Sequence, residues 1–188
     1  DAALAVGGRV DRVDGWLKDG RLYLRVVDYK TGKRSFDLAD VYYGMNMQML
    51  LYLFALEREG AGLYGHQVVP AGVLYFPARD VLLSMDRSSS EESIRAAMDR
   101  ELRRSGLVLA DPAVLQAMEP GALEGPKYLP LTIKRDGTIT SGVATAEQLG
   151  KLGRYTEKIL RQIAAELRGG VIDADPWTRS ENDSACTD

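Results

Sequence analysis

Two aspartates and a lysine near the start of the chain have the types and spacing needed for metal-dependent hydrolysis. Asp11 lies in one predicted strand, and Asp28 and Lys30 lie two residues apart in the next. Side chains alternate along a strand, so Asp28 and Lys30 project from the same face, about 7 Å apart. Two carboxylates about 4 Å apart repel by about 4 kcal/mol at an effective dielectric of about 20, which favours a divalent ion such as Mg²⁺ or Mn²⁺. These residues predict metal-assisted phosphodiester hydrolysis, with the lysine stabilising developing negative charge.

The element that must bring the aspartates together is a predicted β-hairpin over residues 8–31. Asp19-Gly20 suits a two-residue type I′ turn between two runs rich in β-branched and aromatic residues. A turn of this length fixes the register of every later pair, and continuing that register places Asp11 directly opposite Asp28. The hairpin therefore predicts two facing carboxylates on one face.

The other face of the same hairpin pairs Asp14 with Arg25, so we interpret Asp14 as structural. A simpler interpretation also exists for the two facing carboxylates. They could lie on a solvated rim of the sheet, where Lys30 neutralises them without any catalytic role.

A second pair of polar residues lies in a predicted buried helix over residues 41–58, with Asp40 as its N-cap. Gln48 and Tyr52 are four residues apart and so project from one side of this helix. Both could face the same cleft as the aspartates. Alternatively, Gln48 bonds to backbone and Tyr52 packs in the core.

The remaining pattern predicts a mixed α/β fold in which helices flank a mixed sheet. Pro112, Pro120, Pro126 and Pro130 mark a loop-rich stretch, and the chain is polar from residue 173. The other predicted elements are strands over 71–76, 80–85 and 129–133, a helix over 90–105 with a Ser89–Glu92 capping box, and a helix from the Thr145–Gln148 capping box to Arg168, ended by Gly169-Gly170.

Composition narrows the possible classes of protein. The chain has 188 residues and a net charge of −3, which suits one soluble domain without the general basic charge of an electrostatic DNA binder. One cysteine and one histidine argue against an internal disulfide, a thiolate metal cage and triad chemistry. Asp1 opens neither a signal peptide nor a natural translation start, and no apolar run reaches membrane length. We therefore expect a piece of a longer cytoplasmic protein with no membrane partner.

A basic stripe runs along the last predicted helix, formed by Lys151, Arg154, Lys158 and Arg161. Their three- and four-residue spacing places them on one side, where they could meet DNA phosphates. Amphipathic surface helices commonly carry such a stripe, so a merely solvated face is the competing interpretation.

Three motifs together carry a family resemblance: GRVDRVD over residues 8–14, VDYKTGK over 27–33 and QMLLY over 48–52. In this arrangement the chain resembles the PD-(D/E)XK nuclease superfamily in its RecB-like branch. The resemblance implies a restriction-endonuclease-like fold, with Asp11 and Asp28 as metal ligands and Lys30 as the catalytic lysine. It also implies that Gln48 and Tyr52 form the glutamine-tyrosine motif of this branch.

Further segments more narrowly resemble AddB-type nuclease domains: VYYG over 41–44, PAGVLYF over 70–76 and ACT over 185–187. This resemblance implies a Mg²⁺-dependent deoxyribonuclease, an exonuclease that acts with a helicase-nuclease partner of the AddA type in double-strand break repair and recombination. It also implies a [4Fe-4S] cluster in the full-length protein, with Cys186 as one ligand. One thiolate cannot hold such a cluster, so none is expected in this fragment.

We accordingly expect an N-terminally truncated nuclease domain over residues 1–172. Residues 173–188 are then a polar tail that opens a truncated iron-sulfur cysteine segment. The superfamily usually supplies a further acidic residue or histidine from an earlier helix, and this chain starts only ten residues before Asp11. Whether the isolated fragment is active stays open. Two alternatives are a noncatalytic module that binds DNA ends or acts as a scaffold, and a stand-alone Cas4-like or other RecB-like exonuclease.

Overall fold

The computed structural model describes residues 5–32, 35–173, 176, 178–180 and 183–184. At its centre lies a five-stranded sheet with the order β1-β2-β3-β4-β7. β2 and β3 are parallel, as are β4 and β7, whereas β1–β2 and β3–β4 are antiparallel pairs. The strands are β1 (Arg12–Lys18), β2 (Arg21–Lys30), β3 (Gln67–Pro77), β4 (Ser105–Leu109) and β7 (Val143–Ala144). The predicted mixed α/β class is confirmed.

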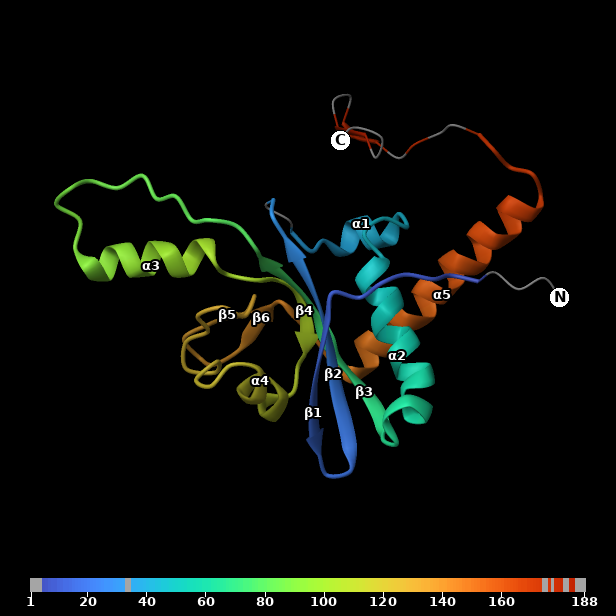
Figure 1. The fold of residues 1–188 in the computed structure, drawn as a ribbon, viewed down its shortest axis with the longest axis horizontal. Coiled ribbons are helices and arrows are strands. Elements are labelled where there is room, and N and C mark those ends of the chain that lie inside the picture. The colour runs from blue at the N-terminus through green and yellow to red at the C-terminus, as the bar shows by residue number, and fades with distance from the viewer. Residues whose placement is uncertain (1–4, 33–34, 174–175, 177, 181–182, 185–188) are drawn as a thin grey trace.

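Helices lie on both sides of this sheet (Figure 1). One side carries α1 (Leu38–Tyr42), α2 (Gln48–Tyr64) and α5 (Ala146–Arg168). The other carries α4 (Pro112–Met118) and a small sheet of β5 (Thr132–Ile133) and β6 (Ile139–Ser141), while α3 (Glu91–Glu101) projects outward. A second small sheet pairs β8 (Thr178–Ser180) with β9 (Asp183–Ser184). Among the described residues, no helix is both long and apolar enough to span a lipid bilayer.

The central strand β3 supplies two hydrophobic cores, because its side chains alternate between the two faces of the sheet. Val73 and Tyr75 belong to a first core with Leu50 of α2. Leu74, between them in sequence, belongs to a second core with Leu115 of α4. Leu50, Leu74 and Leu115 are each 0% exposed. The sheet is thus buried on both faces.

The β1–β2 hairpin has the predicted turn and register. Asp19 and Gly20 have φ angles of 50° and 76°, and two positive φ values in succession are the signature of a type I′ turn. Pairing runs from Lys18↔Arg21 to Arg12↔Val27. Because a one-residue slip would turn every side chain over, this ladder confirms the predicted assignment of residues to faces.

The predicted helix over residues 41–58 is wrong at both ends, since α2 runs on to Tyr64. The chain forms the short helix α1, breaks, and begins again at Gln48 in α2. Gly44 and Asn46 cause the break, since both have positive φ angles, 80° and 52°, that no α-helix contains. Asp40 is not an N-cap either: it is buried and accepts a hydrogen bond from Asn46 Nδ2 at 2.9 Å.

Several predicted boundaries also need correction. No strand forms over 80–85, where Leu82 is 93% exposed and so contributes no burial to stabilise one. α3 begins after Ser90 rather than Ser89, and it ends before residue 105, where β4 starts. The strand predicted over 129–133 is reduced to β5, and the predicted loop contains α4, because Pro112 occupies a first-turn position that tolerates proline.

The last long helix is confirmed. Thr145 Oγ1 accepts a hydrogen bond from the Gln148 backbone N–H at 3.2 Å, and Gln148 Oε1 accepts one from the Thr145 N–H at 2.8 Å. This reciprocal capping box starts α5, which ends at Arg168 as predicted. Leu152 and Ile159 pack against the first core, which also contains Leu50 of α2. α5 therefore helps to hold α2 against the sheet.

Candidate active site at the end of the sheet

Lys30 is the last residue of β2, and Asp28 lies two residues before it. Both side chains lie on the face of the sheet that α2 covers. Lys30 Nζ lies 2.6 Å from Asp28 Oδ2, and the two side chains are 33% and 17% exposed. Asp28 Oδ2 is buried but accepts no hydrogen bond within the described part of the chain. The Lys30 ammonium therefore balances the charge of the carboxylate at that oxygen, and a bound cation would have to share the oxygen with Lys30 or replace it.

Asp11 reaches the same end of β2 by a side-chain contact rather than by strand pairing. The β1–β2 ladder stops at Arg12↔Val27, one pair short of the predicted Asp11–Asp28 pair. Instead, Asp11 Oδ2 accepts a hydrogen bond from the Tyr29 backbone N–H at 3.1 Å. Tyr29 directly follows Asp28, so this bond ties the Asp11 carboxylate to the backbone beside Asp28.

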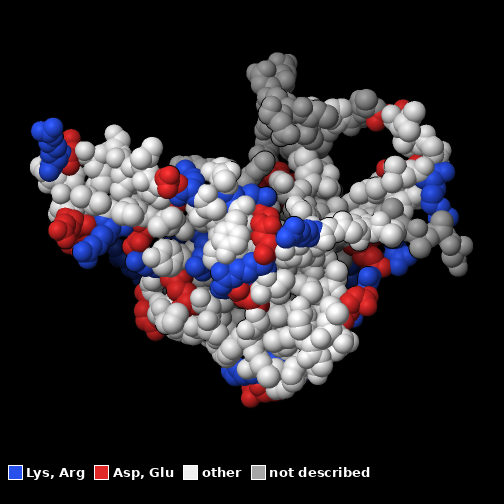
Figure 2. Space-filling view, viewed as in Figure 1, with Lys and Arg blue, Asp and Glu red and all other residues white. Residues whose placement is uncertain are grey.

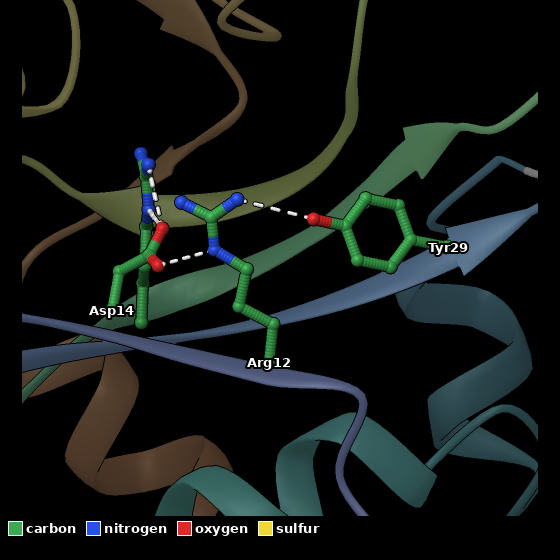
Figure 3. A network of polar contacts seen from close by, with 4 residues as sticks. Arg12, Asp14 and Tyr29 are labelled. Carbon is green, nitrogen blue, oxygen red and sulfur yellow. Dashed lines mark hydrogen bonds and ion pairs between the residues drawn. The ribbon is translucent and has the colours of Figure 1, made fainter.

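A polar network on the opposite face of the hairpin fixes Tyr29 (Figure 3). Arg12 Nη1 donates to the Tyr29 hydroxyl at 3.1 Å, and Arg12 Nε donates to Asp14 Oδ1 at 2.6 Å. Arg25 Nε donates to the other Asp14 oxygen at 2.9 Å, which confirms the predicted Asp14–Arg25 pair. The network holds the strand segment whose Tyr29 N–H donates to Asp11.

Electrostatics explain why Asp14 stays ionised in that network. Partial burial acts to raise the pKa of Asp14, but the hydrogen bonds from Arg12 and Arg25 outweigh it and hold the pKa below its usual value. The hydrogen bond to Tyr29, followed by the contact with Asp14, raises the pKa of Arg12. Both partners are thus charged at neutral pH, as their structural role requires.

Gln48 and Tyr52 contact each other across the first turn of α2. Gln48 Nε2 donates to the Tyr52 hydroxyl at 3.0 Å. A Cβ atom on Gly8 would lie 2.1 Å from that hydroxyl, so the backbone just before β1 rests directly on Tyr52. The partner of Gln48 in this contact is a side chain rather than backbone. Tyr52 is partly buried and packs against the first core, as the structural alternative for it predicts.

The set of oxygen donors suits a hard cation, although it contains only two carboxylates. Among the described residues, no group of three or more His, Cys, Asp or Glu side chains could hold a metal. Asp11 and Asp28 offer two carboxylates, of which Asp28 forms an ion pair with Lys30 and Asp11 accepts a hydrogen bond from the Tyr29 N–H. Mg²⁺ is commonly held by one or two carboxylates and keeps several waters. The residues present therefore fit Mg²⁺ or Mn²⁺ better than a metal that demands a full protein cage.

The basic stripe on α5 is partly neutralised within its own helix. Lys151 Nζ lies 2.8 Å from Glu147, and Arg161 Nη2 lies 2.5 Å from Glu157. These pairs favour the solvated-face interpretation for two of its four members. DNA binding by the stripe, Lys151, Arg154, Lys158 and Arg161, stays a prediction, and Cys186 lies outside the described residues.

Sequence reasoning missed a cavity of about 220 Å³ beside Lys30. Arg79, Arg100 and Ser105 line it, and they come from the segment after β3, from α3 and from β4. They share no spacing or motif, because folding alone gathers them at the end of the sheet. The arginine content of residues 79–104 was the one signal available, and it does not indicate which side chains converge.

The five-stranded mixed sheet flanked by helices is consistent with a nuclease fold, and the strand-end carboxylate and lysine and the Gln48–Tyr52 contact form its candidate site. The chain belongs to the PD-(D/E)XK nuclease superfamily, whose family model matches residues 2–188. Members of this superfamily generally use divalent metals.

Curated relatives place the chain more narrowly. It is 38% identical over 181 residues to the B-type subunit of the ATP-dependent helicase/deoxyribonuclease from Desulforudis audaxviator, and the match covers 95% of this chain and 16% of the relative. The corresponding protein of Acetivibrio thermocellus is 35% identical over 174 residues, covering 92% of this chain and 15% of that protein. That of Clostridium botulinum strain Hall is 35% identical over 180 residues, with 94% and 16% covered. The chain thus spans about a sixth of the length of these relatives.

Proposed function

We propose that this chain is a DNA-hydrolysing nuclease domain that uses Mg²⁺ or Mn²⁺ bound by Asp11 and Asp28. The observation that carries the proposal is the convergence at the end of β2. There Lys30 contacts Asp28 at 2.6 Å, and Asp11 is tied to the next backbone N–H. Nuclease superfamily membership and relatives named as deoxyribonuclease subunits support it.

Each residue has a distinct task in this proposal. An ion on the two carboxylates would lower the pKa of a bound water and offset negative charge on the phosphate. The Lys30 ammonium donates a hydrogen bond to a phosphate oxygen that gains negative charge during in-line attack. Gln48 and Tyr52 hold the segment that leads into Asp11 and present polar groups toward the nucleotide.

The relatives' names support coupling to a helicase, and the family resemblance in the sequence supports the rest of the finer role. We propose an exonuclease domain of a helicase-nuclease that acts in double-strand break repair and recombination inside the cytoplasm. Its partners would be DNA and an AddA-like subunit. Residues 1–172 would form the nuclease domain, and the segment from residue 173, with Cys186, would open the cysteine region that holds a [4Fe-4S] cluster in a full-length protein.

The metal proposal is tested by calorimetric titration of Mn²⁺ into the protein and its Asp28→Ala variant, together with cleavage of labelled single-stranded DNA. We expect the substitution to abolish the binding heat and to lower cleavage by at least about a hundredfold, because one of two ligands and the Lys30 partner are lost. Asp136→Asn is the matched control, since this aspartate lies in the exposed β5–β6 turn. Equal heats from wild type and Asp28→Ala would exclude the metal site.

A second result separates catalysis from binding. If DNA binds but is not cut under any divalent ion, and Asp28→Ala binds it equally well, the domain is a noncatalytic DNA-end-binding or scaffolding module. Full activity of the chain without any helicase partner would instead favour a stand-alone exonuclease. The first outcome contradicts the nuclease proposal, and the second contradicts the helicase-coupled role.

A further inference from the structure

The cavity beside Lys30 lies at the end of the sheet where β2 and β3 finish and β4 begins. Lys30, Tyr75 and Pro77 form its floor on the strand side, and Ser105 opens β4 next to them. Strand pairing places Asp28 beside Tyr75 and Lys30 beside Pro77, on one face of the sheet. The cavity is therefore a continuation of the candidate active site across the sheet toward β4.

Its charge is opposite to that of the chain. The lining holds one lysine and three arginines against one glutamate, a local balance of +3, whereas the whole chain carries −3. Figure 2 shows basic and acidic side chains interleaved over the visible face, without a broad patch of one sign. Charges of one sign in a cleft with low-dielectric walls focus the field. An anion is the ligand that this cavity favours.

The arginines divide into a structural one and two that can bind. Arg103 donates to the main-chain oxygens of Leu129 and Leu131, so it anchors the wall. Arg79 Nη2 donates to Glu101 at 2.6 Å, but its Nε is buried with no hydrogen-bond partner in the described part of the chain. A buried donor without a partner costs free energy, which an anion would recover if the Arg79 side chain turned that donor toward the cavity on binding.

Arg100 supplies a second donor from the last turn of α3. Its Nε donates to the Ala96 carbonyl of its own helix at a long 3.3 Å, and Arg100 is one of the residues that line the cavity. Arginine forks match phosphate oxygens better than a lysine point charge does. Arg79 and Arg100 thus provide the donor type that a phosphodiester needs.

The geometry points to a second phosphate subsite in this cavity. We infer that Arg79 and Arg100 bind the DNA phosphate next to the one held at Asp28 and Lys30, so that the strand runs across the end of the sheet toward α3. At about 220 Å³ the cavity is smaller than the ~300–1,000 Å³ typical of whole-ligand pockets, which suits one phosphate with its sugar. This inference rests on the proposed nuclease function.

The test measures binding of a fluorescent single-stranded oligonucleotide by anisotropy, with Ca²⁺ replacing Mg²⁺ to suppress cleavage. We expect Arg100→Ala and Arg79→Ala each to weaken binding roughly ten- to a hundredfold, the cost of a charge-assisted hydrogen bond. The slope of log K against log[salt] should become shallower by about 0.7, because one phosphate contact is lost. Arg58→Ala is the control, because its side chain is 76% exposed on α2, away from the cavity.

The Glu101→Gln variant should change DNA affinity in the opposite direction. The amide can still accept the Arg79 hydrogen bond while the acidic charge in the cavity is removed, so DNA binding should tighten severalfold. A variant that merely disturbs the fold would weaken binding instead. Unchanged or weaker binding by Glu101→Gln would overturn the inference.

A chemical probe locates the contact. In wild type, one neutral methylphosphonate at the phosphate adjacent to the cleaved bond should cost about tenfold in affinity, and Arg100→Ala should be insensitive to it. If the arginine variants bind and cut DNA like wild type, the subsite is wrong while the nuclease proposal stands. If wild type neither binds metal nor cuts DNA, the nuclease proposal fails first.

Discussion

Asp11 and Asp28 reach one end of the sheet by different physical means. Asp28 is placed by the alternation of β2, which also fixes Lys30 on its side. Asp11 lies beyond the last ladder pair and depends on the Tyr29 N–H. Tyr29 in turn depends on Arg12 across the hairpin. The position of one candidate ligand is therefore set by a chain of hydrogen bonds.

Gly8 is the residue where a single methyl group should disturb the site. A Cβ there would lie 2.1 Å from the Tyr52 hydroxyl, so Gly8→Ala must displace either Tyr52 or the segment leading to Asp11. We expect DNA cleavage to fall roughly ten- to a hundredfold, the cost of a displacement of about 1 Å in a catalytic site. Initial cleavage rates on labelled DNA measure this.

The neighbouring glycine provides the control for that change. A Cβ on Gly7 would meet nothing within 4 Å, so Gly7→Ala should cleave DNA like wild type. Equal rates from Gly8→Ala and wild type would show that the contact with Tyr52 has no part in activity.

At the scale of elements, the candidate site depends on where helices begin. α2 starts at Gln48 only because the chain breaks at Gly44 and Asn46. α5 starts at its Thr145 capping box and then packs Leu152 against the first core. Each start decides which side chains face the sheet.

The Thr145 cap gives a measurable contribution to stability. Thr145→Ala removes the hydroxyl that accepts the Gln148 N–H, so the free energy of unfolding should fall by about 1 kcal/mol. Thr145→Ser keeps the hydroxyl and should leave the free energy of unfolding nearly unchanged, because serine caps helices at least as well as threonine. Urea unfolding followed by circular dichroism compares the three proteins, and equal losses from both variants would exclude the cap as the cause.

At the scale of the whole molecule, β3 couples the two cores. Leu74 faces one and its neighbours Val73 and Tyr75 face the other, so neither side of the sheet can lose its packing alone. Asp28 lies next to Tyr75 in the same sheet. The candidate site therefore depends on both halves of the fold.

This coupling predicts one unfolding transition. Leu50→Ala in the first core and Leu115→Ala in the second should each lower the free energy of unfolding by about 2–5 kcal/mol, since both leucines are 0% exposed. Circular dichroism and tryptophan fluorescence should report the same midpoint in each variant. Leu82→Ala, at a side chain 93% exposed, should change little. Two separate midpoints would mean that the cores unfold independently.

Local features followed from short stretches of sequence without reference to the rest of the chain. Asp19-Gly20 set the turn, and the turn set the hairpin register, because a two-residue loop allows few backbone solutions. The spacing of Asp28 and Lys30 and the Thr145 cap likewise act within a few residues. The motifs over 8–14, 27–33 and 48–52 were sufficient to indicate the family.

Long-range packing settled the features that no local pattern predicts. It ended the ladder before Asp11, formed β4 where no strand was predicted and α4 within a predicted loop, and brought Arg79 and Arg100 to Lys30. These outcomes rest on contacts between residues far apart in the chain, and local propensity carries no information about such contacts. A pattern of residue types can indicate a chemistry, but the shape of the site is set by burial and charge summed over the whole fold.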